Sequence, residues 1–187
     1  PGRDVGREMT GGAIHVHGNA GDWVGGEMHG GLIHVRGNAG HLIGSAYRGS
    51  ATGMTGGAIL VGGSAGNEVG LTLRRGLVAI GGACGDFVGA NMIAGTVLVF
   101  GACGNRPAAA MRRGTVGLLG ENPPSLLVTF RKSCVCQPTF LRVIFRHLES
   151  LGLAVPSEYY SANYGLYHGD RVSVGRGEIL IRETRAA

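Results

Sequence analysis

The stretch Met9-Thr-Gly-Gly-Ala-Ile-His-Val-His-Gly-Asn-Ala-Gly21 decides the fold, because the chain repeats it. The second glycines of consecutive phrases are separated by 19, 26, 19, 19 and 19 residues. A period of this length predicts a repeat architecture, in which each unit forms one turn of a solenoid. The six phrases, the last of them decayed, occupy Met9–Gly21, Met28–Gly40, Met54–Gly66, Leu73–Gly85, Met92–Gly104 and Met111–Gly120.

Each phrase contains a short segment with the alternation of a strand. In Ile14-His15-Val16-His17, for example, β-branched residues occupy every second position. Glycines flank these segments at constant offsets, where a corner needs positive φ or close backbone approach. A unit of 19 residues is too short for a strand–helix–strand unit, which needs about 30. We therefore predict an all-β fold, a parallel β-helix whose coils stack about 4.8 Å apart.

Stacking of the coils would place equivalent residues in ladders. Two apolar ladders should point inward, and a third, of methionines and one leucine, recurs in register without polar partners and fits core packing better than a ligand surface. Cys84 and Cys103 replace alanines in a fourth ladder and are interpreted as small buried residues. The three apolar ladders are Ile14, Ile33, Ile59, Val78, Val97 and Val116; Val16, Val35, Val61, Ile80, Val99 and Leu118; and Met9, Met28, Met54, Leu73, Met92 and Met111.

The positions between the inward residues change along the array. They are polar in the early coils, with His15 and His34, and apolar in the later ones. An apolar outward face of this kind must be covered, either by the C-terminal tail or by a partner subunit. The two histidines have no carboxylate beside them in sequence, which favours a solvated or interface ladder over a metal site. The candidate partner interface comprises Leu60, Leu98, Phe100 and Leu119, together with Tyr47 and Arg48.

Tyr47 and Arg48 belong to the insertion that lengthens one step to 26 residues. The insertion falls near Ser45–Gly53, after Gly44. Insertions in solenoids become loops on one face, often a contact face. A contact loop and a neutral surface loop are both open interpretations.

Two arginine pairs occupy the same slot two coils apart, Arg74-Arg75 and Arg112-Arg113. The strand spacing places them about 10 Å from each other. With Arg106 they would form a basic strip for an acidic partner or ligand, while scattered surface solvation is the alternative. No aromatic residues are interleaved with them, which disfavours a nucleic-acid partner.

After Gly120 the repeat ends, and we divide the chain into a repeat region, residues 1–120, and a C-terminal capping or interaction extension, residues 121–187. Leu126–Phe130 has the pattern of a strand. Pro138 opens a predicted helix, Thr139–Leu151, with apolar residues at helical spacing. A hairpin is expected from Val172, Val174, Ile179 and Ile181, around Gly175-Arg176-Gly177. This extension would cap the open end of the solenoid.

Composition excludes several function classes. The 12 acidic residues, against 17 basic ones, are too few for an aspartate-rich calcium solenoid or an acidic catalytic cleft.

The sequence also bears on localisation. No apolar run is long enough to span a membrane, and no signal peptide is evident. Four cysteines without disulfide or metal spacing favour a reducing cytoplasm. No catalytic or metal-binding set is recognised. Gly2–Gly6 aligns with Gly21–Gly25, so at least one further coil is expected before Pro1.

The repeated glycine pattern resembles a domain that occurs in the large chain of glutamate synthase and in the C-type subunit of formylmethanofuran dehydrogenase. Two further segments favour the family of the C-type subunit. They are Pro138-Thr139-Phe140-Leu141 with its helix, and Tyr167-His168-Gly169-Asp170 followed by Gly175-Arg176-Gly177-Glu178-Ile179-Leu180. The resemblance covers nearly the whole chain.

The resemblance implies a right-handed parallel β-helix that serves as a non-catalytic structural subunit of a multisubunit complex of one-carbon metabolism. In the bacterial formyltransferase/hydrolase form, formyl passes from tetrahydromethanopterin to methanofuran and formate is released; the arginine-rich composition favours this form. The alternatives are a redox-active molybdenum or tungsten dehydrogenase and a glutamate synthase-type domain. The resemblance places the catalytic residues, methanofuran and a metal on hydrolase-like and formyltransferase partners, with no cofactor bound by this chain. A separate hypothesis is a binding module, in which the arginine strip holds the glutamyl-rich tail of methanofuran.

Overall fold

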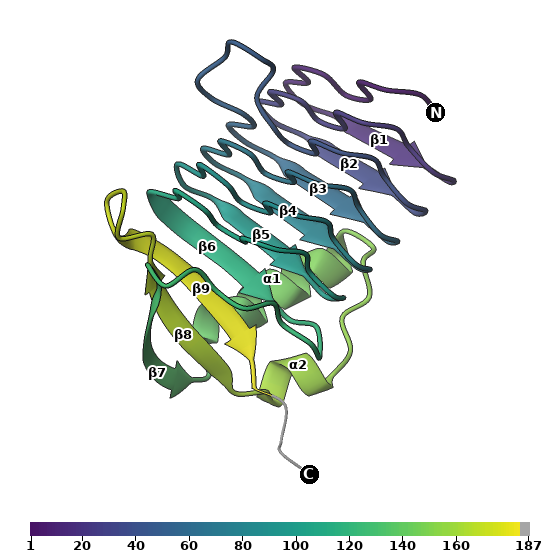
Figure 1. Ribbon diagram of the computed structural model, residues 1–187. Coiled ribbons are helices and arrows are strands. Elements are labelled where there is room, and N and C mark those ends of the chain that lie inside the picture. Colours follow the sequence, from purple (N-terminus) through teal and green to yellow (C-terminus); the bar gives the residue numbers. More distant parts are fainter. Residues whose placement is uncertain (184–187) are drawn as a thin grey trace.

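The computed structural model describes residues 1–183 and is dominated by a single nine-stranded sheet (Figure 1). The strand order is β1-β2-β3-β4-β5-β6-β9-β8-β7, with parallel pairing from β1 through β6 to β9 and antiparallel pairing in the remainder. The predicted all-β character and the parallel pairing are thus confirmed. The strands are β1 (Ala13–Val16), β2 (Leu32–Val35), β3 (Ala58–Val61), β4 (Leu77–Ile80), β5 (Thr96–Val99), β6 (Arg113–Leu118), β7 (Arg131–Cys136), β8 (Tyr164–Gly169) and β9 (Arg176–Arg182).

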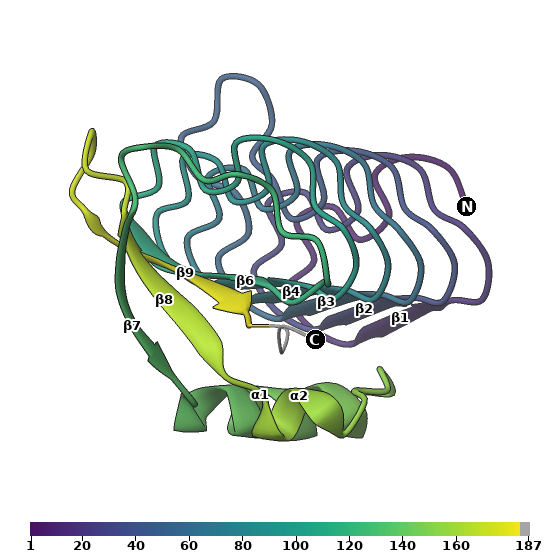
Figure 2. The ribbon, with the colours of Figure 1, turned by 60° about the horizontal axis from the view of Figure 1, so that its bottom comes forward.

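The first six strands are the repeated phrases, paired in the register that the glycine alignment predicts. Ile14 lies beside Ile33, and Val97 beside Val116. Between strands the chain follows a similar curved path in successive coils, except for the loop that protrudes between β2 and β3 (Figure 2). Backbone hydrogen bonds join neighbouring coils along this path as well, for example from Ala20 N to Asn38 O at 2.8 Å. The coils are therefore held together on more than one side.

Small polar side chains complete the hydrogen bonding at the corners. Asn19 Oδ1 accepts from the Asn38 N–H at 2.9 Å, and Asn38 Oδ1 accepts from the Ser64 N–H at 2.8 Å. Asp22 Oδ1 likewise accepts from the His41 N–H at 2.9 Å. These ladders satisfy backbone donors at corners where no strand partner is available, so the asparagines and aspartate have a structural function.

The interior of the coils is an apolar core built from the predicted ladders. Met28, Met54, Met92 and Met111 are fully buried among the inward valines and isoleucines. Their interpretation as core residues is confirmed. The close stacking also explains the glycines: Gly31 has φ +94°, and a Cβ there would lie 2.7 Å from Gly12 O.

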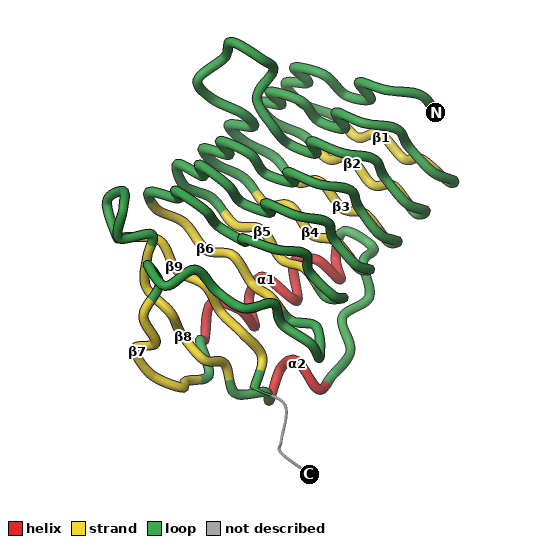
Figure 3. The backbone as a smooth tube through the Cα atoms, viewed as in Figure 1, coloured by secondary structure: helices red, strands yellow, loops and turns green. Residues whose placement is uncertain are grey.

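A second apolar cluster lies outside the sheet. The helix α1 (Thr139–Ser150) and the short helix α2 (Glu158–Ser161) lie along the outer sheet face (Figures 2 and 3). The buried face of α1 consists of Leu141, Phe145 and Leu148. The predicted helix is confirmed except that Leu151 is its C-cap residue, and the sequence pattern does not predict α2.

Two sequence assignments in the extension are wrong. Leu126–Phe130 is not a strand: Leu126 and Leu127 pack against the coil interior, and the Phe130 N–H donates to Leu127 O at 3.0 Å, which closes a turn. The hairpin exists, but β8 forms its first strand, while Val172 and Val174 lie in the connecting loop, 79% and 52% exposed.

β9 extends the sheet beyond the six repeats. It pairs in parallel with β6, with Gly177 beside Gly114 and Ile179 beside Val116. A segment 63 residues downstream of β6 in sequence thus takes the place of a next coil, which the period does not predict. At Gly177 a Cβ would lie 2.5 Å from Met111 Sδ, so glycine allows β9 to approach the last coil.

Asp170 provides a hydrogen-bond acceptor for a backbone N–H group at the end of the array. In successive coils the N–H groups of Thr72 and Asn91 donate to carbonyl oxygens of the following coil, Ala90 O and Ala109 O. Ala110 has the equivalent position in the last coil, and its N–H donates to Asp170 Oδ2 at 3.0 Å. A side-chain carboxylate therefore replaces the missing carbonyl group.

Candidate functional site

The two arginine pairs lie where the chain enters β4 and β6, and Arg113 is the first residue of β6. The N–H groups of Arg74 and Arg75 both donate to Met54 O, at 3.0 and 3.2 Å, and Arg112 N donates to Met92 O at 2.8 Å. Because these backbone donors are already used within the array, a ligand at this corner would be held by the guanidinium groups. All four arginines are exposed.

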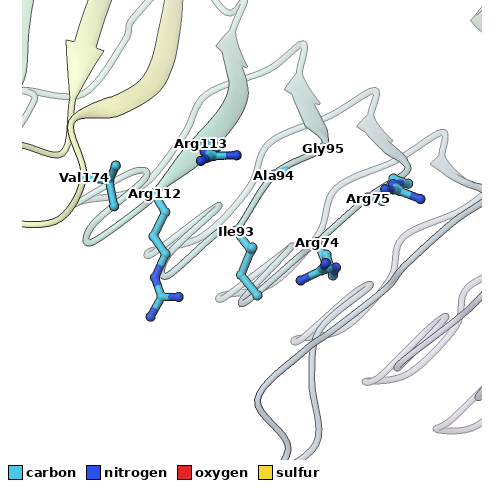
Figure 4. A pocket seen from close by; sticks show the side chains of 8 residues that line it. All are labelled: Arg74, Arg75, Ile93, Ala94, Gly95, Arg112, Arg113 and Val174. Atoms are coloured by element: carbon cyan, nitrogen blue, oxygen red, sulfur yellow. The ribbon is translucent and has the colours of Figure 1, made fainter.

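The four arginines surround one surface cavity of about 470 Å³ (Figure 4). The coil between the two pairs has Ala94 where the neighbouring coils have Arg75 and Arg113, so this small residue leaves the space open. Val174, from the β8–β9 loop, lies beside Arg112 in the view. The complete lining is Arg74, Arg75, Ile93, Ala94, Gly95, Arg112, Arg113 and Val174.

The cavity is strongly basic. No carboxylate lines it, and none of the four arginines forms a salt bridge within residues 1–183. Guanidinium groups bind carboxylates and phosphates in a bidentate manner, so the arrangement suits an anionic ligand. Arg106, proposed for the same strip, does not line the cavity; its guanidinium lies 5.8 Å from the centroid of the Phe87 ring.

His15 and His34 occupy equivalent positions in adjacent strands. His15 and His34 have ring centroids 6.1 Å apart, and His34 is buried below the Leu151–Leu153 segment that follows α1. Burial, followed by the nearby charges of His15 and Arg36, lowers the pKa of His34. Among residues 1–183, no group of three or more histidine, cysteine, aspartate or glutamate side chains is arranged to hold a metal ion.

The cysteines occupy two separate places. Cys84 and Cys103 are free thiols in adjacent coils, where their backbones form an isolated parallel β-bridge. Burial raises the pKa of each thiol to about 12. A thiol with so high a pKa is a poor nucleophile at neutral pH, which agrees with a packing function. Cys134 and Cys136 lie on β7, the strand at the end of the sheet.

Comparison with solved structures shows what the chain is similar to. The chain superposes with a TM-score of 0.89 and 33% sequence identity on a chain of the formyltransferase/hydrolase complex from Methylorubrum extorquens, whose structure contains methylofuran. The match covers 97% of this chain and 67% of that one. The chain belongs to the family of this complex component. No protein-family model and no curated protein matches it.

Three leucines that were predicted to contact a partner subunit are buried within the chain itself. Leu60, Leu98 and Leu119 are fully buried, in the cluster that α1 completes. The expected cover is therefore the chain's own C-terminal extension, and the assignment of these three residues to a partner interface is wrong. Phe100 is half-buried at the edge of the same cluster, with its ring centroid 5.2 Å from that of Tyr159.

The insertion loop packs back on the first coils. Tyr47 stacks on Trp23 with ring centroids 4.5 Å apart, donates its hydroxyl to Asp4 Oδ1 at 2.7 Å, and lies 4.6 Å from the guanidinium of Arg7. Arg48 is exposed. The half-buried Tyr47 has a packing function, whereas contact of Arg48 with a partner stays a prediction.

No helix within residues 1–183 is long and apolar enough to cross a membrane.

The tail motif that supports the family resemblance has a packing explanation. A Cβ at Gly169 would collide with the Phe130 ring, and Asp170 binds the last coil through Ala110. The function of Asp170 could not be read from the sequence, because nothing in the periodicity points to Ala110, which lies 60 residues away along the chain.

Proposed function

We propose that the chain is a non-catalytic structural subunit of a multisubunit formyltransferase/hydrolase complex. The observation that supports this most strongly is the match over 97% of the chain to a component of such a complex. In agreement with it, the surface cavity lined by Arg74, Arg75, Arg112 and Arg113 has no other charged residue in its lining. The chain would contribute rigid surface, while hydrolase-like and formyltransferase partners perform the chemistry.

The finer assignment is the C-type subunit, which we propose from the repeat and from the tail motif around Gly169, Asp170 and Gly177. We also propose that the stacked coils form a right-handed parallel β-helix. The parallel register of β1 to β6 and the hydrogen bonds between corners support a β-helix.

Assembly and activity provide the test. Co-expressed with candidate hydrolase-like and formyltransferase subunits, the tagged chain should retain them on an affinity column, and formyl transfer from tetrahydromethanopterin to methanofuran with release of formate should appear only in the assembly. Formyl transfer by the isolated chain would contradict a structural function. Recovery of a molybdenum- or tungsten-containing partner would favour the redox dehydrogenase instead, and amidotransferase sequence in the parent chain would favour a glutamate synthase-type domain.

A second candidate function is binding of the acidic tail of methanofuran at the arginine cavity. It is supported by four exposed arginines around one cavity without a carboxylate. Charge reversal at Arg74, Arg75, Arg112 and Arg113 should then weaken cofactor binding to the assembled complex and leave its set of subunits unchanged. Unchanged cofactor affinity would exclude this function without affecting the structural one.

A further inference from the structure

The four cysteines form two pairs that differ in exposure and surroundings. Cys84 and Cys103 lie inside the repeat region, where Cys84 is buried and Cys103 is half-buried. Burial raises the pKa of each of these thiols to about 12, so both stay protonated at neutral pH. Cys134 is exposed and Cys136 is half-buried, and both lie on β7. A small oxidant in solution can therefore react with the second pair more easily than with the first.

Cys134 and Cys136 lie on the same face of the sheet. Side chains two positions apart on a strand point to one face, and in the antiparallel register Cys134 is opposite Leu166 and Cys136 is opposite Tyr164. Leu166 and Tyr164 belong to the apolar cluster that α1 completes. Burial, followed by the neighbouring Cys134 thiol, raises the pKa of Cys136. The two thiols are therefore close neighbours on the side of β7 that faces the helices.

The strand that carries the two thiols is held on one side only. β7 is last in the strand order, and within residues 1–183 it pairs only with β8. The register shifts between Lys132 and Cys134, so Ser133 has no paired residue and the strand is irregular beside the thiols. Two residues of a regular strand advance about 6.4–6.8 Å, whereas the Cα atoms of a disulfide lie about 4.4–6.8 Å apart. A small contraction of this edge strand would therefore bring the two sulfur atoms within bonding reach.

We propose that Cys134 and Cys136 form a reversible oxidation site, at which a low-molecular-weight disulfide such as oxidised glutathione converts the two thiols into an intramolecular disulfide. The inference does not rest on the proposed structural function. Exposed and strained disulfides are the ones that are easily reduced again. A bond of this kind fits a compartment in which thiols are mostly reduced, where disulfides are usually transient.

The reaction needs no oxidant besides the small disulfide. The exposed Cys134 loses its proton to solvent, and its thiolate attacks one sulfur of oxidised glutathione, so that a mixed disulfide forms and the first glutathione leaves as a thiolate. The thiolate of Cys136 then attacks the Cys134 sulfur; the bond between Cys134 Sγ and Cys136 Sγ forms, and the second glutathione leaves. The two protein thiols lose two electrons and two protons, and one glutathione disulfide becomes two thiols.

Metal binding is a less suitable chemistry for this pair. A structural zinc site has four protein ligands, and Cys134 and Cys136 supply two. In the part of the chain that the structure describes, no group of three or more cysteine, histidine, aspartate or glutamate side chains is arranged to hold a metal ion. Two thiols are, however, the full requirement for a disulfide.

A change at Cys136 would reach the helices through the next residue. Gln137 Nε2 donates to Ser161 O and to Asn163 Oδ1, both at 3.1 Å, and Gln137 Oε1 accepts from Arg142 Nη2 at 3.3 Å. These bonds connect the end of β7 with α1, with α2 and with the start of β8. Contraction of β7 should displace Gln137 and weaken this connection, so the oxidised chain should exchange amide hydrogens faster in α1 and α2.

The test equilibrates the full chain with mixtures of reduced and oxidised glutathione, blocks the remaining thiols with a maleimide, and counts them by mass spectrometry of the intact chain and its peptides. The oxidised chain should lose two free thiols, both in the peptide that contains Cys134 and Cys136, and dithiothreitol should restore them. In the variant Cys136→Ser the reaction should stop at the first step, so Cys134 should carry one glutathione.

Two double variants separate the two pairs of cysteines. Cys134→Ser with Cys136→Ser should abolish both the loss of thiols and the faster amide exchange. The matched control, Cys84→Ala with Cys103→Ala, should leave both unchanged, because alanine already occupies the equivalent position in earlier coils. Unfolding curves establish that each variant is folded.

Several results would overturn the proposal. Thiol loss that persists in Cys134→Ser with Cys136→Ser would assign the oxidation to the pair inside the repeat region. Crosslinked dimers as the main product would show that the thiols react between chains, and a stable mixed disulfide in the unmodified chain would show that Cys136 cannot reach Cys134. Oxidation without a change in amide exchange would overturn the connection to α1 and α2. None of these results bears on the structural function, because that is measured by retention of partner subunits.

Discussion

At the scale of single residues, glycine is required more strictly where two coils lie in close contact than where only a positive φ is needed. Gly31 and Gly49 have nearly the same φ, +94° and +93°. A Cβ at Gly31 would lie 2.7 Å from Gly12 O, whereas nothing lies within 4 Å of a Cβ at Gly49. Gly49→Ala should therefore cost about 1–2 kcal/mol, the conformational term for positive φ.

Gly31→Ala should cost clearly more than Gly49→Ala, because the coils must also separate to accept the methyl group. Urea unfolding of the two variants measures the difference directly. Equal losses of unfolding free energy would mean that the left-handed conformation, and not the contact between coils, is the reason for glycine at this corner.

Asp170 provides a stability contribution that depends on pH. Burial alone raises the pKa of the carboxyl, but the hydrogen bonds from Val172 and Ala110 lower it below its ordinary value of 3.8. A pKa that is lower in the folded state stabilises the fold above the unfolded pKa, and this stabilisation is lost as pH falls through the folded pKa. Asp170→Asn should lower the unfolding free energy by about 1.5–3 kcal/mol at neutral pH, the usual range for hydrogen bonds to a charged group.

The difference between Asp170→Asn and the unmodified chain should be constant near neutral pH and should narrow only below about pH 4, where the carboxyl begins to protonate. Urea midpoints measured from neutral to acid pH would show this. A gap that widens on acidification would contradict the assigned direction of the pKa. Glu121→Gln, a change at an exposed carboxyl, serves as the control and should leave the profile unchanged.

At the scale of elements, α1 is a cover for the outer sheet face, and its two sides should respond differently to mutation. Phe145 is fully buried in the second cluster, whereas Val143 is 66% exposed. Phe145→Ala should lower the unfolding free energy by about 3–5 kcal/mol. Val143→Ala should change it by about 0.5 kcal/mol or less. A large loss at Val143, measured by urea unfolding, would contradict the orientation of the helix.

The sequence predicts the elements whose apolar residues recur at regular spacing, but it does not predict the elements whose structure depends on contacts distant in sequence. The inward ladders and α1 follow from local spacing, so Ile59 and Leu148 could be assigned to buried faces from sequence. The segment Leu126–Phe130 has apolar residues without alternation of buried and exposed faces, because it closes the coil interior. The sequence predicts that Leu60 and Leu98 are covered, and the structure shows them buried. It could not predict whether a helix of the same chain or a partner subunit covers them, because either cover requires the same apolar residues on the sheet.

At the scale of the whole molecule, two basic surface cavities show what the repeat period predicts and what only the fold reveals. The pairing of Arg74 with Arg112 across two coils follows from the period, and the structure places them around one cavity. Arg131 and Arg171 reach the neighbouring cavity only because β9 joins the sheet beside β6 and brings the hairpin with it. No local pattern in the sequence indicates the pairing of β9 with β6, so the cavity lined by Arg131 and Arg171 could be found only from the fold.

The C-terminal extension completes the repeat region instead of merely following it, and a chain of residues 1–120 tests this. Without the extension, β6 loses its pairing with β9, and Leu60, Leu98 and Leu119 lose the cover of α1. An open strand edge beside an apolar face promotes association between copies. The shortened chain should therefore form larger species in light scattering at concentrations where residues 1–187 do not.

The double variant Leu60→Lys with Leu98→Lys in the shortened chain should reduce this association, because it makes the exposed face polar. A shortened chain that scatters like the full one would mean that the repeats are an independent unit and that the extension only interacts with other proteins.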